Sequence, residues 1–132
     1  MISTELRIGN VIDGDAKGMR VVAILNDYII AVTPQGNEIT QRMELIKPTE
    51  LTDEWKERLG FKGTDTRKGF YHLQVNKSIL LLVDKGKWEL MTRINKIPTA
   101  FPCPQLKYVH SLQNLIFALT GSEIEIKQSK YE

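Results

Sequence analysis

The chain has 132 residues, of which 42% are hydrophobic and 26% are charged, and its formal net charge is +2. This length and composition are typical of one soluble globular domain with a real core. The longest apolar run, residues 79–83, is far too short to cross a bilayer, and the single cysteine, Cys103, excludes an internal disulfide. The first residues lack the basic and apolar regions of a signal peptide, so we expect a cytoplasmic protein that engages no membrane.

The first 47 residues predict a strand-rich unit. Strand patterns alternate with turn signals such as Asn26-Asp27, and they occupy residues 6–12, 19–25, 28–33 and 38–46. Gly9 interrupts the first pattern and indicates a bulge or a close backbone approach. Short strands with tight turns at this spacing predict a small curled antiparallel sheet, either SH3-like or a partial barrel.

Residues 48–61 predict a short helix. Thr52 is a good N-cap, and two carboxylates follow it, where the helix dipole favours negative charge. Trp55 and Leu59 line the apolar side of this helix, and Gly60 suits the position just past its end.

Residues 70–94 predict an antiparallel meander. Its central strand has no polar face, since Leu81 and Val83 point to one side and Leu80 and Leu82 to the other. A strand that is apolar on both faces is expected to be buried on both faces. We therefore expect the C-terminal helix to cover one face, and the N-terminal strands, the short helix or another chain to cover the other.

The last part of the chain predicts an extended connector, a helix and a strand. Prolines in residues 97–104 fix the backbone and remove hydrogen-bond donors. Residues 106–121 show helical periodicity that ends at Gly121, and residues 123–127 alternate like a final edge strand. Together, the elements predict an α+β fold in which residues 1–132 form a single fused domain.

The C-terminal helix has two distinct faces. A core-facing apolar stripe is formed by Tyr108, Val109, Leu112, Leu115, Ile116 and Leu119. The opposite face holds His110, Gln113, Asn114 and Phe117, which are neighbours on the helix surface. Two interpretations stay open. Either the polar side chains bond within the chain and Phe117 packs under a loop or strand, or the four residues form a contact surface for a protein partner.

A basic bias marks residues 61–107, which carry nine Lys or Arg and three acidic residues. The candidate contacts for nucleic-acid phosphates are Arg67, Lys68, Lys77, Lys85, Lys87, Arg93 and Lys96. Tyr71 and Trp88 share strand faces with apolar residues, so we expect them to lie in the core rather than to stack on bases.

Residues that could carry chemistry are sparse. A nucleophilic thiol needs a base, and nothing beyond the presence of His72 and His110 supports such a role for Cys103. The chain has no metal-ligand spacing, phosphate-binding glycine motif or serine elbow, and the Asp13-Gly14-Asp15 loop lacks the later ligands of a calcium loop. We therefore predict that the protein is not an enzyme and uses no cofactor and no metal.

Both ends and the centre of the chain resemble a known family. The motifs that carry the likeness are Glu5–Asn10, Leu51–Trp55, Leu59–Phe61 and Tyr108–Gly121. They are similar to motifs of small uncharacterised proteins from gut Bacteroides-type bacteria and their prophages. The resemblance implies a mobile-element setting and no catalytic residue. We expect a non-catalytic interaction module that binds a protein partner or itself, and the alternative is nucleic-acid binding through residues 61–107.

Overall fold

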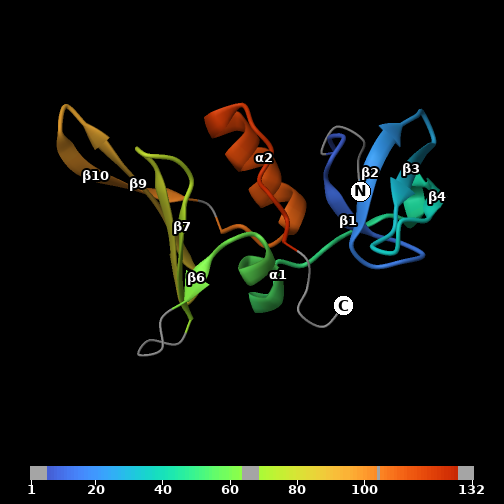
Figure 1. Ribbon diagram of the computed structural model, residues 1–132, viewed down its shortest axis with the longest axis horizontal. Coiled ribbons are helices and arrows are strands. Elements are labelled where there is room, and N and C mark those ends of the chain that lie inside the picture. Colours follow the sequence, from blue (N-terminus) through green and yellow to red (C-terminus); the bar gives the residue numbers. More distant parts are fainter. Residues whose placement is uncertain (1–5, 64–68, 104, 128–132) are drawn as a thin grey trace.

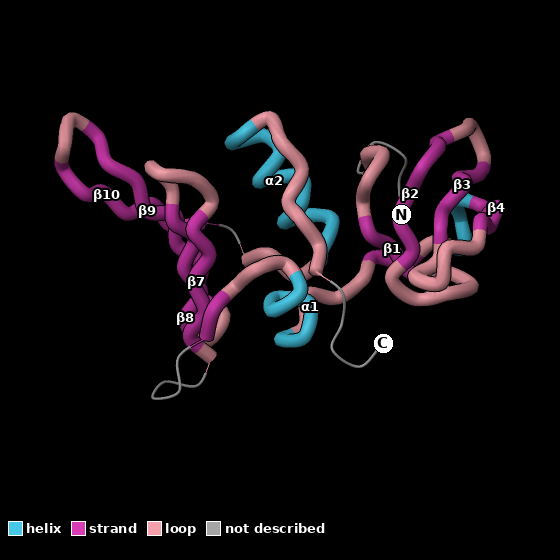
Figure 2. Tube along the Cα trace, viewed as in Figure 1, coloured by secondary structure: helices cyan, strands magenta, loops and turns pink. Residues whose placement is uncertain are grey.

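The computed structural model describes residues 6–63, 69–103 and 105–127, and it consists of two antiparallel sheets with two helices between them (Figure 1, Figure 2). The N-terminal sheet, in the order β4-β3-β2-β1-β5, contains β1 (Val11–Asp13), β2 (Met19–Ile24), β3 (Tyr28–Val32), β4 (Glu38–Arg42) and β5 (Lys47–Pro48). The second sheet, in the order β10-β9-β8-β7-β6, contains β6 (Lys62–Gly63), β7 (Phe70–Gln74), β8 (Leu80–Asp84), β9 (Lys87–Ile94) and β10 (Ile97–Cys103). The helices are α1 (Asp53–Arg58) and α2 (Val109–Thr120).

The N-terminal sheet is a curled half-barrel, as the sequence predicts. β2 and β3 form a hairpin across the expected turn, where Leu25 N–H donates to Tyr28 O (2.9 Å). The register shifts between Val21 and Ala23, and a bulge of this kind bends the strand and increases its twist. A 3-10 turn, Met43–Leu45, precedes β5, which pairs with β1. The sheet curls around a core formed by Leu6, Ile12, Met19, Val21, Ile29, Ala31 and Ile46.

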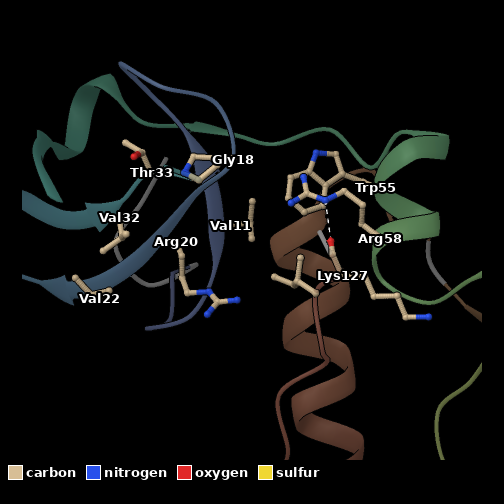
Figure 3. A pocket seen from close by; sticks show the side chains of 11 residues that line it. Val11, Gly18, Arg20, Val22, Val32, Thr33, Trp55, Arg58 and Lys127 are labelled. Atoms are coloured by element: carbon tan, nitrogen blue, oxygen red, sulfur yellow. Dashed lines mark hydrogen bonds between the residues drawn. The ribbon is translucent and has the colours of Figure 1, made fainter. Parts of the chain in front are cut away.

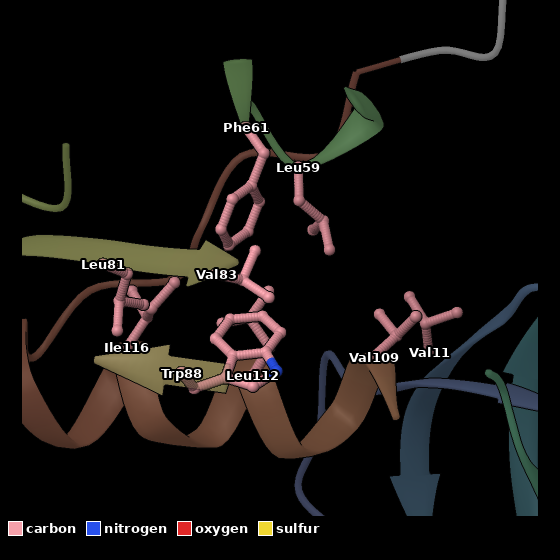
Figure 4. Packing of buried hydrophobic residues seen from close by; sticks show 9 residues of the cluster. All are labelled: Val11, Leu59, Phe61, Leu81, Val83, Trp88, Val109, Leu112 and Ile116. Carbon is pink, nitrogen blue, oxygen red and sulfur yellow. The ribbon is translucent and has the colours of Figure 1, made fainter. Parts of the chain in front are cut away.

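The second sheet packs one face on α2, which confirms the predicted cover of the meander. In β8, Leu81 and Val83 are 0% and 2% exposed. Leu112 and Ile116 of α2 belong to the same buried cluster, and Trp88 of β9 lies among them (Figure 4). Four of the six residues predicted for the apolar stripe, Val109, Leu112, Leu115 and Ile116, therefore belong to this cluster or pack against it, whereas Tyr108 stacks on His110.

The sequence predicts the start of α1 and the end of α2, whereas α2 begins at Val109, three residues later than expected, after an extended Tyr108. The Thr52 hydroxyl accepts a hydrogen bond from Trp55 N–H (3.3 Å) and caps α1. Past the end of α2, Gly121 has a φ of 73°, in the left-handed region that glycine adopts without strain. α1 is only six residues long, so its position depends on the packing of Trp55 and Leu59 rather than on helix propensity.

Within the described chain, the central strand is fully buried on one face only, so neither the N-terminal strands nor the short helix supplies the cover expected on its other face. Leu80 and Leu82 are only partly buried and belong to neither apolar core of the described residues, although Leu81 between them is fully buried. α2 lies on the Leu81 side, and the half-barrel lies beyond it (Figure 1). The double-sided apolar pattern thus leaves one face of the second sheet uncovered within the described chain.

Two C-terminal segments differ from prediction as well. The predicted connector forms β10, an edge strand that pairs with β9 along its whole length. Its prolines fit because one side of an edge strand has no ladder partner. Residues 123–127 do not form a strand, and Lys127 N–H donates to Arg58 O (2.7 Å). The isoleucines of this segment pack against the core, so their alternation reflects one-sided burial without a ladder.

α2 joins the two sheets. Val109 N–H donates to Thr49 O (2.9 Å), which ties the start of α2 to the segment before α1. Val11 of β1 belongs to the core of the second sheet and lies beside Val109 (Figure 4). A helix placed between two layers has to offer a face to each, which explains the two-sided pattern of residues 108–120.

Candidate functional site

The polar face of α2 holds the half-barrel. Gln113 is 1% exposed and lies against the backbone at the start of the N-terminal sheet. Its amide oxygen accepts from Val11 N–H (2.8 Å), and its amide nitrogen donates to Gly9 O (2.9 Å). Gly9 has a φ of 97°, and this turn presents its carbonyl to the helix. The glycine that interrupts the predicted strand pattern is therefore favoured by its left-handed φ, whereas an added Cβ would make only ordinary contact with Glu123.

The segment before β1 also reaches Asn114 and Phe117. The Asn10 amide donates to Asn114 Oδ1 (2.9 Å), and Arg7 Nε donates to the same oxygen (3.1 Å). The Arg7 guanidinium forms an ion pair with Glu123 and lies 4.2 Å from the centroid of the Phe117 ring, a cation–π contact. Phe117 remains 38% exposed.

His110 is buried in the first turn of α2. Its ring stacks on the Tyr108 ring with 5.9 Å between centroids. All four residues on the predicted contact face, His110, Gln113, Asn114 and Phe117, thus make contacts within the chain. This arrangement agrees with the internal interpretation of the face, and it leaves part of Phe117 open to solvent.

The predicted nucleic-acid contacts do not gather in one patch. Arg67 and Lys68 lie outside the described residues. The other five divide between the two ends of the second sheet, with Lys77, Arg93 and Lys96 at or near the turns after β7 and β9, and Lys85 and Lys87 around the turn after β8. Five residues of β8 separate the two groups, which at about 3.3 Å per residue places them roughly 17 Å apart. Trp88 is 5% exposed and Tyr71 packs against the core, so both lie where the sequence predicts.

The sheet itself separates Cys103 from His72. Cys103 pairs with Trp88 and packs against the core on the inner face, whereas His72 pairs with Leu82 on the outer face. Burial raises the pKa of the Cys103 thiol and so disfavours the nucleophilic thiolate. Across residues 6–63, 69–103 and 105–127, no three His, Cys, Asp or Glu side chains gather where they could hold a metal ion.

A groove runs between the half-barrel and α1. It encloses about 420 Å³, and its lining residues are Val11, Gly18, Arg20, Val22, Val32, Thr33, Pro34, Trp55, Arg58, Ile126 and Lys127. Figure 3 shows Trp55 and Arg58 of α1 facing Val11, Gly18 and Arg20 of the half-barrel. A second hollow of about 510 Å³ shares Trp55 and Arg58 with the first, so the two adjoin.

Trp55 and Arg58 form one wall of the groove as a stacked pair. They lie three residues apart on α1, and the guanidinium carbon is 4.1 Å from the centroid of the Trp55 ring. Arg58 Nε donates to Lys127 O (3.1 Å), which further fixes the plane of the guanidinium. Only one of its five N–H donors is used in this hydrogen bond.

The opposite wall approaches Trp55 most closely at Gly18. A Cβ added at Gly18 would lie 3.3 Å from the Trp55 ring, and the φ of 68° at this residue also favours glycine. Two residues after Gly18, the exposed Arg20 lies on β2 and pairs with Val32 of β3. The absence of a side chain at Gly18 therefore allows the two walls to lie close together, with Arg58 on one wall and Arg20 on the other.

The charge of the groove changes along its length. The first hollow has the basic residues Arg20, Arg58 and Lys127 and, among its described lining residues, no acidic one. The adjoining hollow has Lys17 and Arg58 together with the acidic residues Asp13, Glu50 and Glu54. One half of the groove is therefore positive and the other is mixed in charge.

The groove residues are absent from the site that the sequence predicts. The spacing of Trp55 and Arg58 on a helix is a signal for their contact, but the apolar pattern of α1 assigns Trp55 to the core. Arg20 belongs to a different sheet, and no local pattern brings it to α1. Comparison of the chain with protein-family models, with curated proteins and with solved structures gives no match. Neither described helix has the length and apolar character that a membrane span needs.

Proposed function

We propose that the protein is a non-catalytic binding module, and that its groove takes a segment of a protein partner with an acidic side chain next to an apolar one. The observation that carries this proposal is the positive half of the groove, where Arg20, Arg58 and Lys127 lie together without an acidic residue among the described lining. A guanidinium held flat binds a carboxylate through two parallel hydrogen bonds. The stacking on Trp55 preorganises Arg58 for this role.

Apolar surface beside the cations supports a peptide as the ligand. Val22 is 40% exposed, and Val32 and Pro34 line the same hollow. An aliphatic side chain next to the acidic one would cover this surface, which stabilises the complex by roughly 25 cal/mol for each Å² removed from water. Binding sites of this kind combine apolar walls with a few oriented polar groups.

The mixed half of the groove argues against a nucleic acid. A phosphate backbone carries charge at regular intervals, so a strand that follows the groove would meet Glu50 and Glu54 after leaving Arg20. A peptide needs only one acidic residue at the positive half. The division of the basic region between two ends of the second sheet gives the nucleic-acid alternative no continuous surface among the described residues. The mobile-element setting stays a prediction.

The two tryptophans allow a direct binding assay. Trp55 lines the groove, whereas Trp88 is buried in the core of the second sheet. In a Trp88→Phe variant, the emission of Trp55 alone would report on the groove. We would select short random peptides on the immobilised protein, and then titrate the enriched peptides by fluorescence. The proposal predicts enriched sequences in which Asp or Glu adjoins an aliphatic residue, together with a saturable change in Trp55 emission.

Charge variants connect the binding to the groove. Arg20→Glu should weaken peptide binding by about tenfold or more, since a hydrogen bond to a charged group contributes about 1.5–3 kcal/mol. Arg42→Glu is the matched control, because Arg42 is an exposed arginine of the same half-barrel outside the groove. An equal loss of peptide affinity in both variants would show that the effect comes from net charge alone. Enrichment without acidic residues, or tight binding of oligonucleotides that Arg20→Glu abolishes, would overturn the proposal.

A further inference from the structure

The outer face of the second sheet has an aliphatic centre that no described element covers. Its cross-strand rows follow from the pairing register, since residues that pair directly share a face. One row is Lys62, His72, Leu82, Glu89 and Pro102, and the next is Gln74, Leu80, Met91 and Ala100. Leu80, Leu82 and Met91 are all only partly buried and outside both apolar cores. The centre of the face is thus aliphatic, and its flanks are polar.

The chain has no remaining described element to place on this face. α2 packs on the inner face through Leu112 and Ile116, and the half-barrel lies on the far side of α2 (Figure 1). Antiparallel strands that face water on one side normally alternate apolar and polar residues. β8 departs from this rule, because Leu80 and Leu82 follow the pattern of a strand with cover on both sides. Since no described element supplies this cover, another chain is the source left among those that the sequence prediction names.

We infer that a second copy of this chain covers the face, in a two-fold dimer whose axis lies in the interface and parallel to β8. The register makes the face complementary to itself under this operation. His72 and Glu89 flank Leu82 on its two sides in the same row. Rotation by 180° about this axis places Leu82 opposite its equivalent in the second copy. The same rotation places His72 of each copy opposite Glu89 of the other. An apolar centre with a donor–acceptor pair on each side is the usual anatomy of an isologous interface.

The area of the face sets the strength of this dimer. β7 and β8 have five residues each, β9 has eight and β10 has seven. At about 3.3 Å per residue and about 4.8 Å between strands, the flat area is about 400 Å² per copy. Two copies would together cover about 800 Å², which is below the lower limit of about 1,200 Å² for stable specific interfaces. The dimer is therefore weak and reversible.

β10 directs association to the face rather than to the sheet edge. Pro98 and Pro102 stand four residues apart on the same side of this edge strand, and neither has an N–H to donate to an added strand. The exposed edge is thus a poor template for open-ended strand addition. A face-to-face contact closes with two copies.

Sedimentation velocity over a wide range of protein concentration tests the inference. The wild-type chain should pass from monomer to dimer as concentration rises, whereas Leu82→Glu should raise the dimer dissociation constant by about tenfold or more, since it buries a carboxylate at the centre. Leu45→Glu is the matched control, because Leu45 is 53% exposed on the half-barrel, and it should dimerise like the wild type. The near-ultraviolet circular dichroism of each variant verifies that its core is intact.

A charge exchange between residues 72 and 89 distinguishes the proposed pairing from nonspecific association. His72→Glu places two carboxylates opposite each other and should weaken the dimer, and adding Glu89→Lys should restore it. This pair also tests the inference if Leu82→Glu fails to fold, because His72 and Glu89 lie on the outer face, away from the core. A wild-type chain that stays monomeric at the highest concentration overturns the inference. So does a dimer that Leu82→Glu and His72→Glu leave unchanged. Neither result bears on the groove, so this inference and the proposed function stand or fall separately.

Discussion

Replacement of Gln113 tests whether the polar face of α2 is the joint between the two sheets. The side chain is 1% exposed, and it connects Val11 N–H to Gly9 O through hydrogen bonds of 2.8 and 2.9 Å. Gln113→Ala removes the acceptor for Val11 N–H and the donor for Gly9 O at once, and the alanine side chain can replace neither. Val11 is 2% exposed, so its N–H would be left buried without its acceptor.

The expected loss follows from the cost of leaving buried groups unsatisfied. A buried group left unsatisfied costs about 1–3 kcal/mol, and the carbonyl of the partly buried Gly9 costs less than the upper value, so Gln113→Ala should lower the free energy of unfolding by about 2–5 kcal/mol. For a chain of 132 residues, about 1 kcal/mol corresponds to about 3 °C in Tm, so the variant should melt about 6–15 °C lower. Gln113→Glu keeps the acceptor but cannot donate to Gly9 O while ionised. Its stability should recover as the pH falls, because the protonated acid regains the donor.

Urea denaturation followed by circular dichroism and by Trp88 fluorescence would measure these changes. Gln35→Ala is the control, since Gln35 is an exposed residue in the turn after β3 and should shift stability by less than about 0.5 kcal/mol. If Gln113→Ala changed the free energy of unfolding by less than about 0.5 kcal/mol as well, the hydrogen bonds to Val11 and Gly9 could not be what joins the two sheets. A Gln113→Glu variant whose stability did not rise at acid pH would contradict the assigned donor and acceptor.

The other predictions concern the second sheet and the groove. Leu81→Ala should cost about 2–5 kcal/mol of unfolding free energy, whereas Leu82→Ala, its neighbour on the open face, should cost about 1 kcal/mol or less in dilute solution; equal losses would contradict the one-sided core. Burial and two nearby carboxylates raise the pKa of Tyr71, so the stability it contributes should be complete below pH 10 and be lost as the pH rises through the raised pKa. Denaturation at a series of pH values should therefore show the difference between wild type and Tyr71→Phe shrinking at high pH, and a constant difference would refute the assignment. Gly18→Ala and Gly36→Ala share the strain of a positive φ, but only the first meets the Trp55 ring, so only the first should change Trp55 emission.

The sequence predicts the local elements well because their signals are local. Thr52 caps α1 and Gly121 ends α2 where short-range backbone chemistry places them. The hairpin turn between β2 and β3 follows from the turn residues between two apolar runs. These features need only neighbours in the chain, so periodicity and turn chemistry are sufficient to find them.

The errors arise where one pattern has two structural meanings. The alternation in residues 123–127 fits an edge strand, yet it reflects burial of one side of a segment that hydrogen-bonds to Arg58. The prolines of residues 97–103 fit a connector, yet they are compatible with the free side of β10. In both cases the deciding fact is whether a strand partner lies alongside, and that is a property of the assembled sheet. The uncovered Leu80 and Leu82 face has the same origin, because the sequence specifies an apolar face without identifying what covers it.

The groove and the joint are two results of one arrangement. The groove's walls come from separate structural units, with Arg20 on the half-barrel and Arg58 on α1, so no single element fixes the distance between them. That distance depends on how the half-barrel is seated on α2, and Gln113 with its hydrogen bonds to β1 determines the seating. Hydrogen bonds suit this task better than apolar packing alone, because they are directional and fix an orientation as well as a contact. The polar face of α2 therefore contributes to the placement of Arg20 relative to Arg58, although none of its four residues lines the groove.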